Sequence, residues 1–138
     1  MKVARKAAAH AEAKPKVELS GVVRVGVAAW LIPGLGHWLL RRRWRGLILF
    51  AAIAAMFLLG LGMHGQIFAA GTASYLKTLG YFGELCVGLP MPLAKFFNYA
   101  GDPFFISADY GTAYLVSAGM LNALAVLDAC DICLERKA

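Results

Sequence analysis

The feature that most constrains the fold is an arginine cluster between two apolar segments, within residues 30–50. The run before the cluster is interrupted by a Pro-Gly pair, and the run after it, residues 46–63, holds no charged residue. As a helix the second run is about 27 Å long, close to the roughly 30 Å of a bilayer's hydrocarbon core. A basic cluster beside such a segment sets which side of the membrane the turn faces. This order predicts an all-α integral membrane protein, and the cluster consists of Arg41, Arg42, Arg43 and Arg45.

The composition favours a membrane domain over a water-soluble one. Hydrophobic residues make up 60% of the 138 residues and charged residues only 16%, whereas soluble domains have about 45–50% and about 25%. The net charge is +6, and the basic residues flank apolar segments instead of covering a surface. We therefore expect anionic lipid headgroups as a partner, and no nucleic acid.

The chain divides into a basic cytoplasmic tail, residues 1–19, and a single helical membrane domain, residues 20–138. Uncharged runs predict two transmembrane helices at about 46–63 and 111–132. Residues 65–110 hold ten of the sixteen aromatic residues and are broken by charges and prolines, which favours interfacial helices on the non-cytoplasmic side. A further re-entrant or full span at about 79–100 stays open. No internal repeat is visible in the sequence.

The first hydrophobic segment, residues 21–40, is broken by Pro33 and Gly34. A proline removes a backbone donor, so this segment is either a kinked span or a re-entrant helix pair. With a re-entrant pair, twelve Lys and Arg residues lie inside and two outside; with a span, six lie inside and eight outside. The positive-inside rule favours the re-entrant pair. We expect both termini in the cytoplasm and the protein in a bacterial inner membrane.

The stretch Pro33-Gly-Leu-Gly-His-Trp-Leu-Leu-Arg-Arg-Arg-Trp-Arg-Gly46 resembles the Pro-Gly-x-Gly-(Gln/His)-x-Tyr-x-Gly-(basic)-Gly signature of small bacterial two-helix membrane domains. It departs from that signature at positions 39 and 41, where an aromatic residue and a glycine are common. The chain is also similar to a bacterial membrane family of unknown function that ends in a helix like Asn122-x5-Asp128-Ala-x-Asp131. The resemblance implies an integral membrane protein with a helical hairpin, and no enzyme activity.

Three polar residues of the last helix are candidate structural positions. Asn122 lies in the middle of an apolar segment, where an amide is expected to find an interhelical partner. Asp128 and Asp131 are three residues apart on one face, and we expect them to pair with the arginines of the cluster or with Arg24. Cys130 and its neighbour three residues on have the spacing of redox or metal pairs, but no second pair accompanies them.

The turn residues and two histidines complete the candidates. Gly34 and Gly36 are expected to form a close-packed hairpin turn after Pro33. His37 and His64 each lie at the end of an apolar segment, and a histidine there can ligate the metal of a chlorophyll or a haem. The competing interpretation is that both bond to backbone or water.

No catalytic constellation is present, so we expect a protein that is not an enzyme. The leading hypothesis is an accessory or scaffold subunit that packs against a larger membrane complex, with a respiratory or photosynthetic assembly as a natural host, or that forms a homo-oligomer. The leading hypothesis involves no cofactor. One alternative is a subunit that ligates chlorophyll or haem through His37 or His64. Another is a small transporter or channel component.

Overall fold

The computed structural model describes residues 19–69, 71 and 74–134, and every regular element in these ranges is a helix. The all-helical class predicted from the sequence is confirmed. The predicted basic tail lies outside the described residues except for its last position. In chain order the helices are α2 (Leu19–Leu31), α3 (Leu35–Leu39), α4 (Arg43–Gly62), α5 (Tyr75–Leu85), α6 (Pro90–Phe96) and α7 (Ala108–Cys133).

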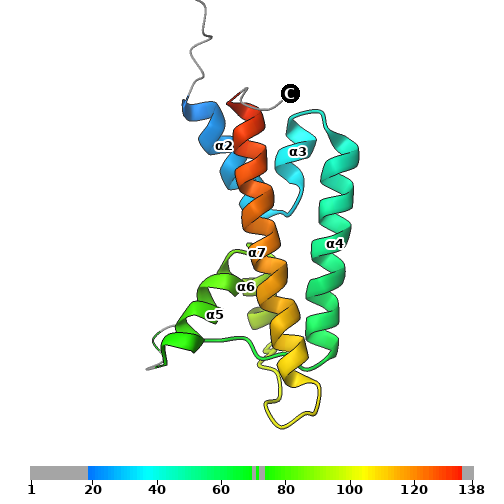
Figure 1. The fold of residues 1–138 in the computed structure, drawn as a ribbon, viewed down its shortest axis with the longest axis vertical. Helices are drawn as coiled ribbons and strands as arrows, with labels where there is room; N and C mark the ends of the chain where they lie inside the picture. The colour runs from blue at the N-terminus through cyan, green and yellow to red at the C-terminus, as the bar shows by residue number, and fades with distance from the viewer. Residues whose placement is uncertain (1–18, 70, 72–73, 135–138) are drawn as a thin grey trace, which may run out of the picture.

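The two longest helices, α4 and α7, run side by side in opposite directions along the length of the molecule (Figure 1). They have 20 and 26 residues and are long and apolar enough to cross a membrane. Their bounds enclose most of the predicted spans at 46–63 and 111–132. The hydrophobic core forms between them, where Ile53, Phe57 and Leu115 are buried.

A hairpin of two short helices precedes α4. α2 ends just before Pro33, and Gly34 has a left-handed φ of 81° that turns the chain into α3. A side chain at Gly34 would overlap the carbonyl of Gly46 on α4, so this turn tolerates only glycine. The start of α2, the α3–α4 turn and the C-terminal end of α7 all lie at the same end of the molecule (Figure 1).

A second hairpin, α5 and α6, precedes α7 and begins near the opposite end of the molecule (Figure 1). Its turn contains Gly88, with a left-handed φ of 85°. This turn contacts the end of α2: the backbone N–H of Leu89 donates to the carbonyl of Leu31 at 3.0 Å. A Cβ at Gly88 would lie 1.9 Å from the carbonyl oxygen of Trp30, so the two backbones approach as closely as glycine allows.

The chain therefore contains two units of the same plan, each a short helix, a turn, a second short helix and a long helix. The first unit is α2–α3–α4 and the second is α5–α6–α7, and their long helices are antiparallel. No repeat is visible in the sequence, because the units share a plan of helices and breaks and not a residue pattern. Within the molecule the α5–α6 turn packs beside the middle of α7, and the interfacial position of residues 65–110 stays a prediction.

Candidate functional site

The most buried polar side chain of the molecule's centre is Asn122, which is 0% exposed in the middle of α7. Its amide nitrogen donates to three backbone carbonyls: Cys86 at 2.8 Å, Trp30 at 3.2 Å and Val87 at 3.3 Å. An amide has two protons, so two of the three carbonyls are fully bonded at any moment. Asn122 thereby joins the two hairpin turns to α7.

These carbonyls belong to the ends of two helices that point toward each other. The last carbonyls of a helix have no partner inside the helix, and that end carries a partial negative charge. Donors from outside the two helices supply the missing bonds here. Besides Asn122, the indole nitrogen of Trp30 donates to the carbonyl of Leu85 at 3.2 Å. These donors join the ends of α2 and α5 to each other and to α7.

A second polar contact joins α3 to α7 near the α3–α4 turn, which holds the arginine cluster and is called the arginine turn below. His37 is 1% exposed, and its Nε2 lies 2.9 Å from a carboxylate oxygen of Asp128. Its Nδ1 is buried without a hydrogen-bond partner. This histidine is 91 positions from Asp128, and the pairing of Asp128 or Asp131 with an arginine stays a prediction. Asp131 lies almost one turn further along α7 and is half-buried.

Close packing surrounds this contact and explains two further predicted residues. Gly36 lies where α3 meets α2 and α7, and an added Cβ would be 2.6 Å from Ala29 and 3.0 Å from Ala129. The sulfur of Cys130 lies beside Gly26 of α2. In the described part of the chain no group of three or more metal-ligating side chains forms.

His64 lies at the opposite end of the molecule, just after α4. It has a left-handed φ of 59°, is exposed, and its ring centroid is 4.3 Å from that of Phe105. Neither His64 nor His37 lines the apolar cavities of about 390, 630 and 340 Å³ among the described residues. Ligation of chlorophyll or haem by either histidine stays a prediction.

The structure also brings together two charged residues that the sequence analysis did not connect. Glu84 is 2% exposed, and one of its carboxylate oxygens accepts the backbone N–H of Phe68 at 2.9 Å. The ammonium group of Lys95 donates to the carbonyl of the same Phe68 at 3.3 Å. The N–H and the carbonyl of Phe68, in the segment after α4, are thus bonded to side chains of α5 and α6. Only the tertiary structure reveals this contact, since the three residues lie 11 or more positions apart.

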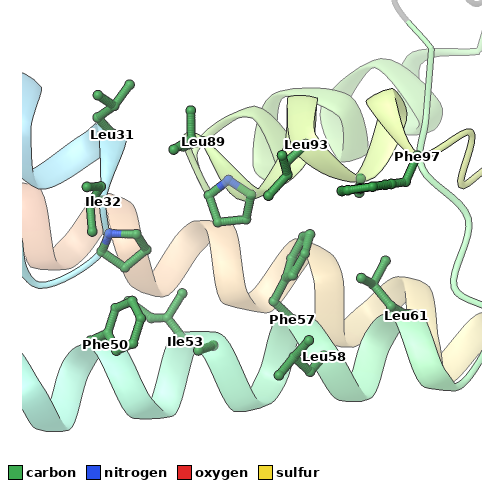
Figure 2. Close-up of a pocket in the computed structure, with 14 residues that line it drawn as sticks. Leu31, Ile32, Phe50, Ile53, Phe57, Leu58, Leu61, Leu89, Leu93 and Phe97 are labelled. Atoms are coloured by element: carbon green, nitrogen blue, oxygen red, sulfur yellow. The ribbon is translucent and has the colours of Figure 1, made fainter.

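An apolar groove of about 390 Å³ runs along α4, between this helix on one side and α6 with the tip of the first hairpin on the other (Figure 2). We call it the α4 groove. Figure 2 shows Phe50, Ile53, Phe57 and Leu61 on the α4 side, facing Leu89, Leu93 and Phe97. Every side chain that lines it is apolar. Such a groove can hold a hydrocarbon chain or a hydrophobic side chain, but not a polar substrate.

Residues 24–138 match a family model described as a family of unknown function, DUF6677. The chain belongs to the DUF6677 family. The match includes all of α3 to α7 and most of α2. No curated protein and no solved structure matches this DUF6677 chain. The family match does not extend to the small two-helix membrane domains, so that resemblance is not confirmed.

Proposed function

We propose that this DUF6677 chain is a non-catalytic integral membrane protein that acts as an accessory subunit of a larger membrane-protein complex. In this proposal α4 and α7 cross a bacterial inner membrane. The two short-helix hairpins enter the bilayer from opposite sides, and their turns meet near its middle. Both termini lie on the cytoplasmic side, together with the arginine turn.

The distribution of charge supports this topology. Twelve of the fourteen Lys and Arg residues fall on the proposed cytoplasmic side. The remaining two, Lys77 and Lys95, belong to the second hairpin, which begins at the other end of the molecule. This asymmetry is the one that membrane insertion favours. Backbone turns at membrane depth need partners from protein, which Asn122 and the contact between the two turns supply.

The use of the buried polar groups supports a non-catalytic role. His37, Glu84 and Asn122 are the buried polar or charged side chains of the described residues. Each of them bonds to another part of the same chain, and each keeps one buried polar atom without a hydrogen-bond partner. The cavities among these residues are lined by apolar side chains, together with the thiol of Cys86 in one and the indole of Trp38 in another. What the molecule offers to a partner is its apolar lateral surface.

The observation that carries the accessory role is the outer face of α4. Trp44, Ala51, Ala55 and Gly62 are all exposed, and their spacing of seven, four and seven residues places them on one face. This face points away from the buried residues Ile53 and Gly60, which pack toward α7. Small residues four apart let a second transmembrane helix approach closely. We propose that this face, the α4 outer face, receives a helix of the partner.

The test is purification of a tagged chain from its native membrane in mild detergent, followed by native gel electrophoresis and mass spectrometry. We expect a particle much larger than the 14.8 kDa chain, containing other membrane proteins. Replacing both alanines of the outer face, Ala51→Leu with Ala55→Leu, should release the partner. Ala52→Leu is the matched control, because Ala52 is also exposed but lies about 100° around the helix from Ala51.

A particle containing only copies of this chain would replace the accessory role by a homo-oligomer. A partner that survives the Ala51→Leu, Ala55→Leu change would refute the outer face as the contact. Recovery of a monomer from mild detergent, with no companion protein, would refute the proposal as a whole.

A second candidate is a transport component, and the two-unit plan is the observation that favours it. Inverted units with broken helices that meet near the bilayer centre are a common architecture of secondary transporters. Their binding sites use the ends of broken helices, and two helix ends also meet at Asn122. Flux of ions or small solutes through proteoliposomes containing the purified chain, lost in Asn122→Leu, would replace the accessory proposal by this one.

A further inference from the structure

The α4 groove continues toward the arginine turn. A second apolar cavity of about 340 Å³ shares Ile32 and Phe50 with it and extends to Trp38 and Gly46. Together the two cavities form one furrow between α4 and the first hairpin. Trp38 lines this second cavity and is 60% exposed, and tryptophan is enriched at the level of lipid headgroups.

An arginine lies on the furrow's own face of α4. Arg43, Leu47, Phe50, Ala54 and Leu61 are separated by four, three, four and seven residues, so they share one face of the helix. The last four line the furrow. Arg43 is exposed one turn before Leu47, at the end of the furrow where the arginine turn begins. The furrow is therefore apolar along its length and has a positive charge at one end.

We propose that this furrow binds one acyl chain of an anionic phospholipid, with the phosphate held by Arg43. The proposal rests on the membrane location proposed above, and not on the accessory role. An acyl chain of one leaflet reaches about 15 Å, half of the hydrocarbon core. At about 1.5 Å per residue this is the distance from Arg43 to Ile53, which lies inside the α4 groove.

The lining of the furrow and the charge beside it favour an anionic lipid. A hydrocarbon chain can lie against the apolar side chains of the furrow while its phosphate reaches Arg43 at the end of the same helix face.

The charge of the headgroup determines the selectivity. Inside a membrane an acyl chain gains little by leaving other chains, because both surroundings are apolar. The arginine adds a preference for anionic lipid of about 1 kcal/mol, which is about fivefold in the dissociation constant. The site should therefore prefer phosphatidylglycerol over phosphatidylcholine, and lose that preference without Arg43.

The experiment is native mass spectrometry of the full-length chain in detergent, titrated with phosphatidylglycerol or phosphatidylcholine. We expect one retained phosphatidylglycerol, and weaker binding of phosphatidylcholine by about fivefold or more. Arg43→Gln should reduce phosphatidylglycerol binding to the phosphatidylcholine level. Arg45→Gln is the matched control, since Arg45 lies on another side of α4 and should have a smaller effect.

Occupancy of the furrow is tested separately by filling it. Ala54→Phe places a ring in the α4 groove and should remove the retained lipid, whereas Ala52→Phe, outside the groove, should not. Equal effects of Arg43→Gln and Arg45→Gln would refute a specific site in favour of diffuse charge attraction. If Ala54→Phe still retains the lipid, the furrow is not the place where the lipid binds. If Ala54→Phe instead loses a co-purified protein while lipid binding is unchanged, the furrow is the site of that protein and not of a lipid.

Failure of this proposal can be told apart from failure of the accessory role. The lipid variants change the furrow face of α4, whereas the partner variants change Ala51 and Ala55 on the outer face. A circular dichroism spectrum and monodisperse elution of each variant exclude unfolding as the cause of lost binding.

Discussion

Replacement of Asn122 by leucine tests how the two hairpin turns are held together. The change keeps the size of the side chain and removes both amide protons from three carbonyls at 2.8 to 3.3 Å. A hydrogen bond between segments of a membrane protein contributes about 0.6 kcal/mol on average and about 1.7 at most. Since two protons are lost, Asn122→Leu should lower the free energy of unfolding by about 1–3 kcal/mol.

The assay is reversible unfolding of the purified chain in mixed micelles with increasing sodium dodecyl sulfate, followed by helical circular dichroism. Ser117→Leu is the control, because Ser117 is on the same helix but is exposed and should cost nothing. A local readout is the thiol of Cys86, at the second turn, in a background with Cys130 and Cys133 changed to serine. Its labelling rate should rise about tenfold for each 1.4 kcal/mol lost by local opening.

The reasoning about Asn122 would be refuted by a loss below about 0.5 kcal/mol in a folded protein, the usual effect of a surface change. It would also be refuted if Ser117→Leu cost as much as Asn122→Leu. In either case the two turns would be held by packing and by their backbone contacts alone.

Two other changes have definite expected outcomes. Gly88→Ala places a Cβ 1.9 Å from the carbonyl oxygen of Trp30 at a left-handed φ, and should lower the free energy of unfolding by about 2–4 kcal/mol in the same assay. The control is Gly21→Ala, which has nothing within 4 Å and should change that free energy by less than about 0.5 kcal/mol. An equal loss in both variants would contradict the close approach of the two backbones. His37→Ala and Asp128→Asn should be non-additive by about 0.5–3 kcal/mol in a double-mutant cycle, because their side chains are 2.9 Å apart; additive effects would mean that the contact contributes nothing.

The long helices were predictable because their signal is local. An uncharged run that is long enough to span a bilayer identifies α4 and most of α7 without any knowledge of their neighbours. The turn at Gly34 was predictable for the same reason, since a Pro-Gly pair breaks a helix wherever it stands.

The contacts between distant segments were not predictable in the same way. His37 and Asp128 are 91 positions apart, and nothing in either neighbourhood sets the register in which α3 meets α7. From the sequence, the arginines were the expected partners of Asp128 because they carry the opposite charge. The same limit hid the contacts of Phe68 with Glu84 and Lys95.

The second hairpin was the least predictable element. Prolines and charges in residues 65–110 indicated breaks, but the place of the turn in the molecule depends on the partners of its backbone groups. Those partners are the end of α2, more than fifty positions earlier, and Asn122, more than thirty positions later. Composition alone could not identify them.

The meeting of the two turns has a consequence for how the chain is made. The carbonyls of Trp30 and Leu31 receive their donors from Asn122 and Leu89, which leave the ribosome more than fifty residues later. In the topology proposed above, these two carbonyls have no partner in the bilayer until those residues arrive. On that proposal the first hairpin should wait at the membrane surface during synthesis and enter only when the second half is inserted, so the two halves mature together.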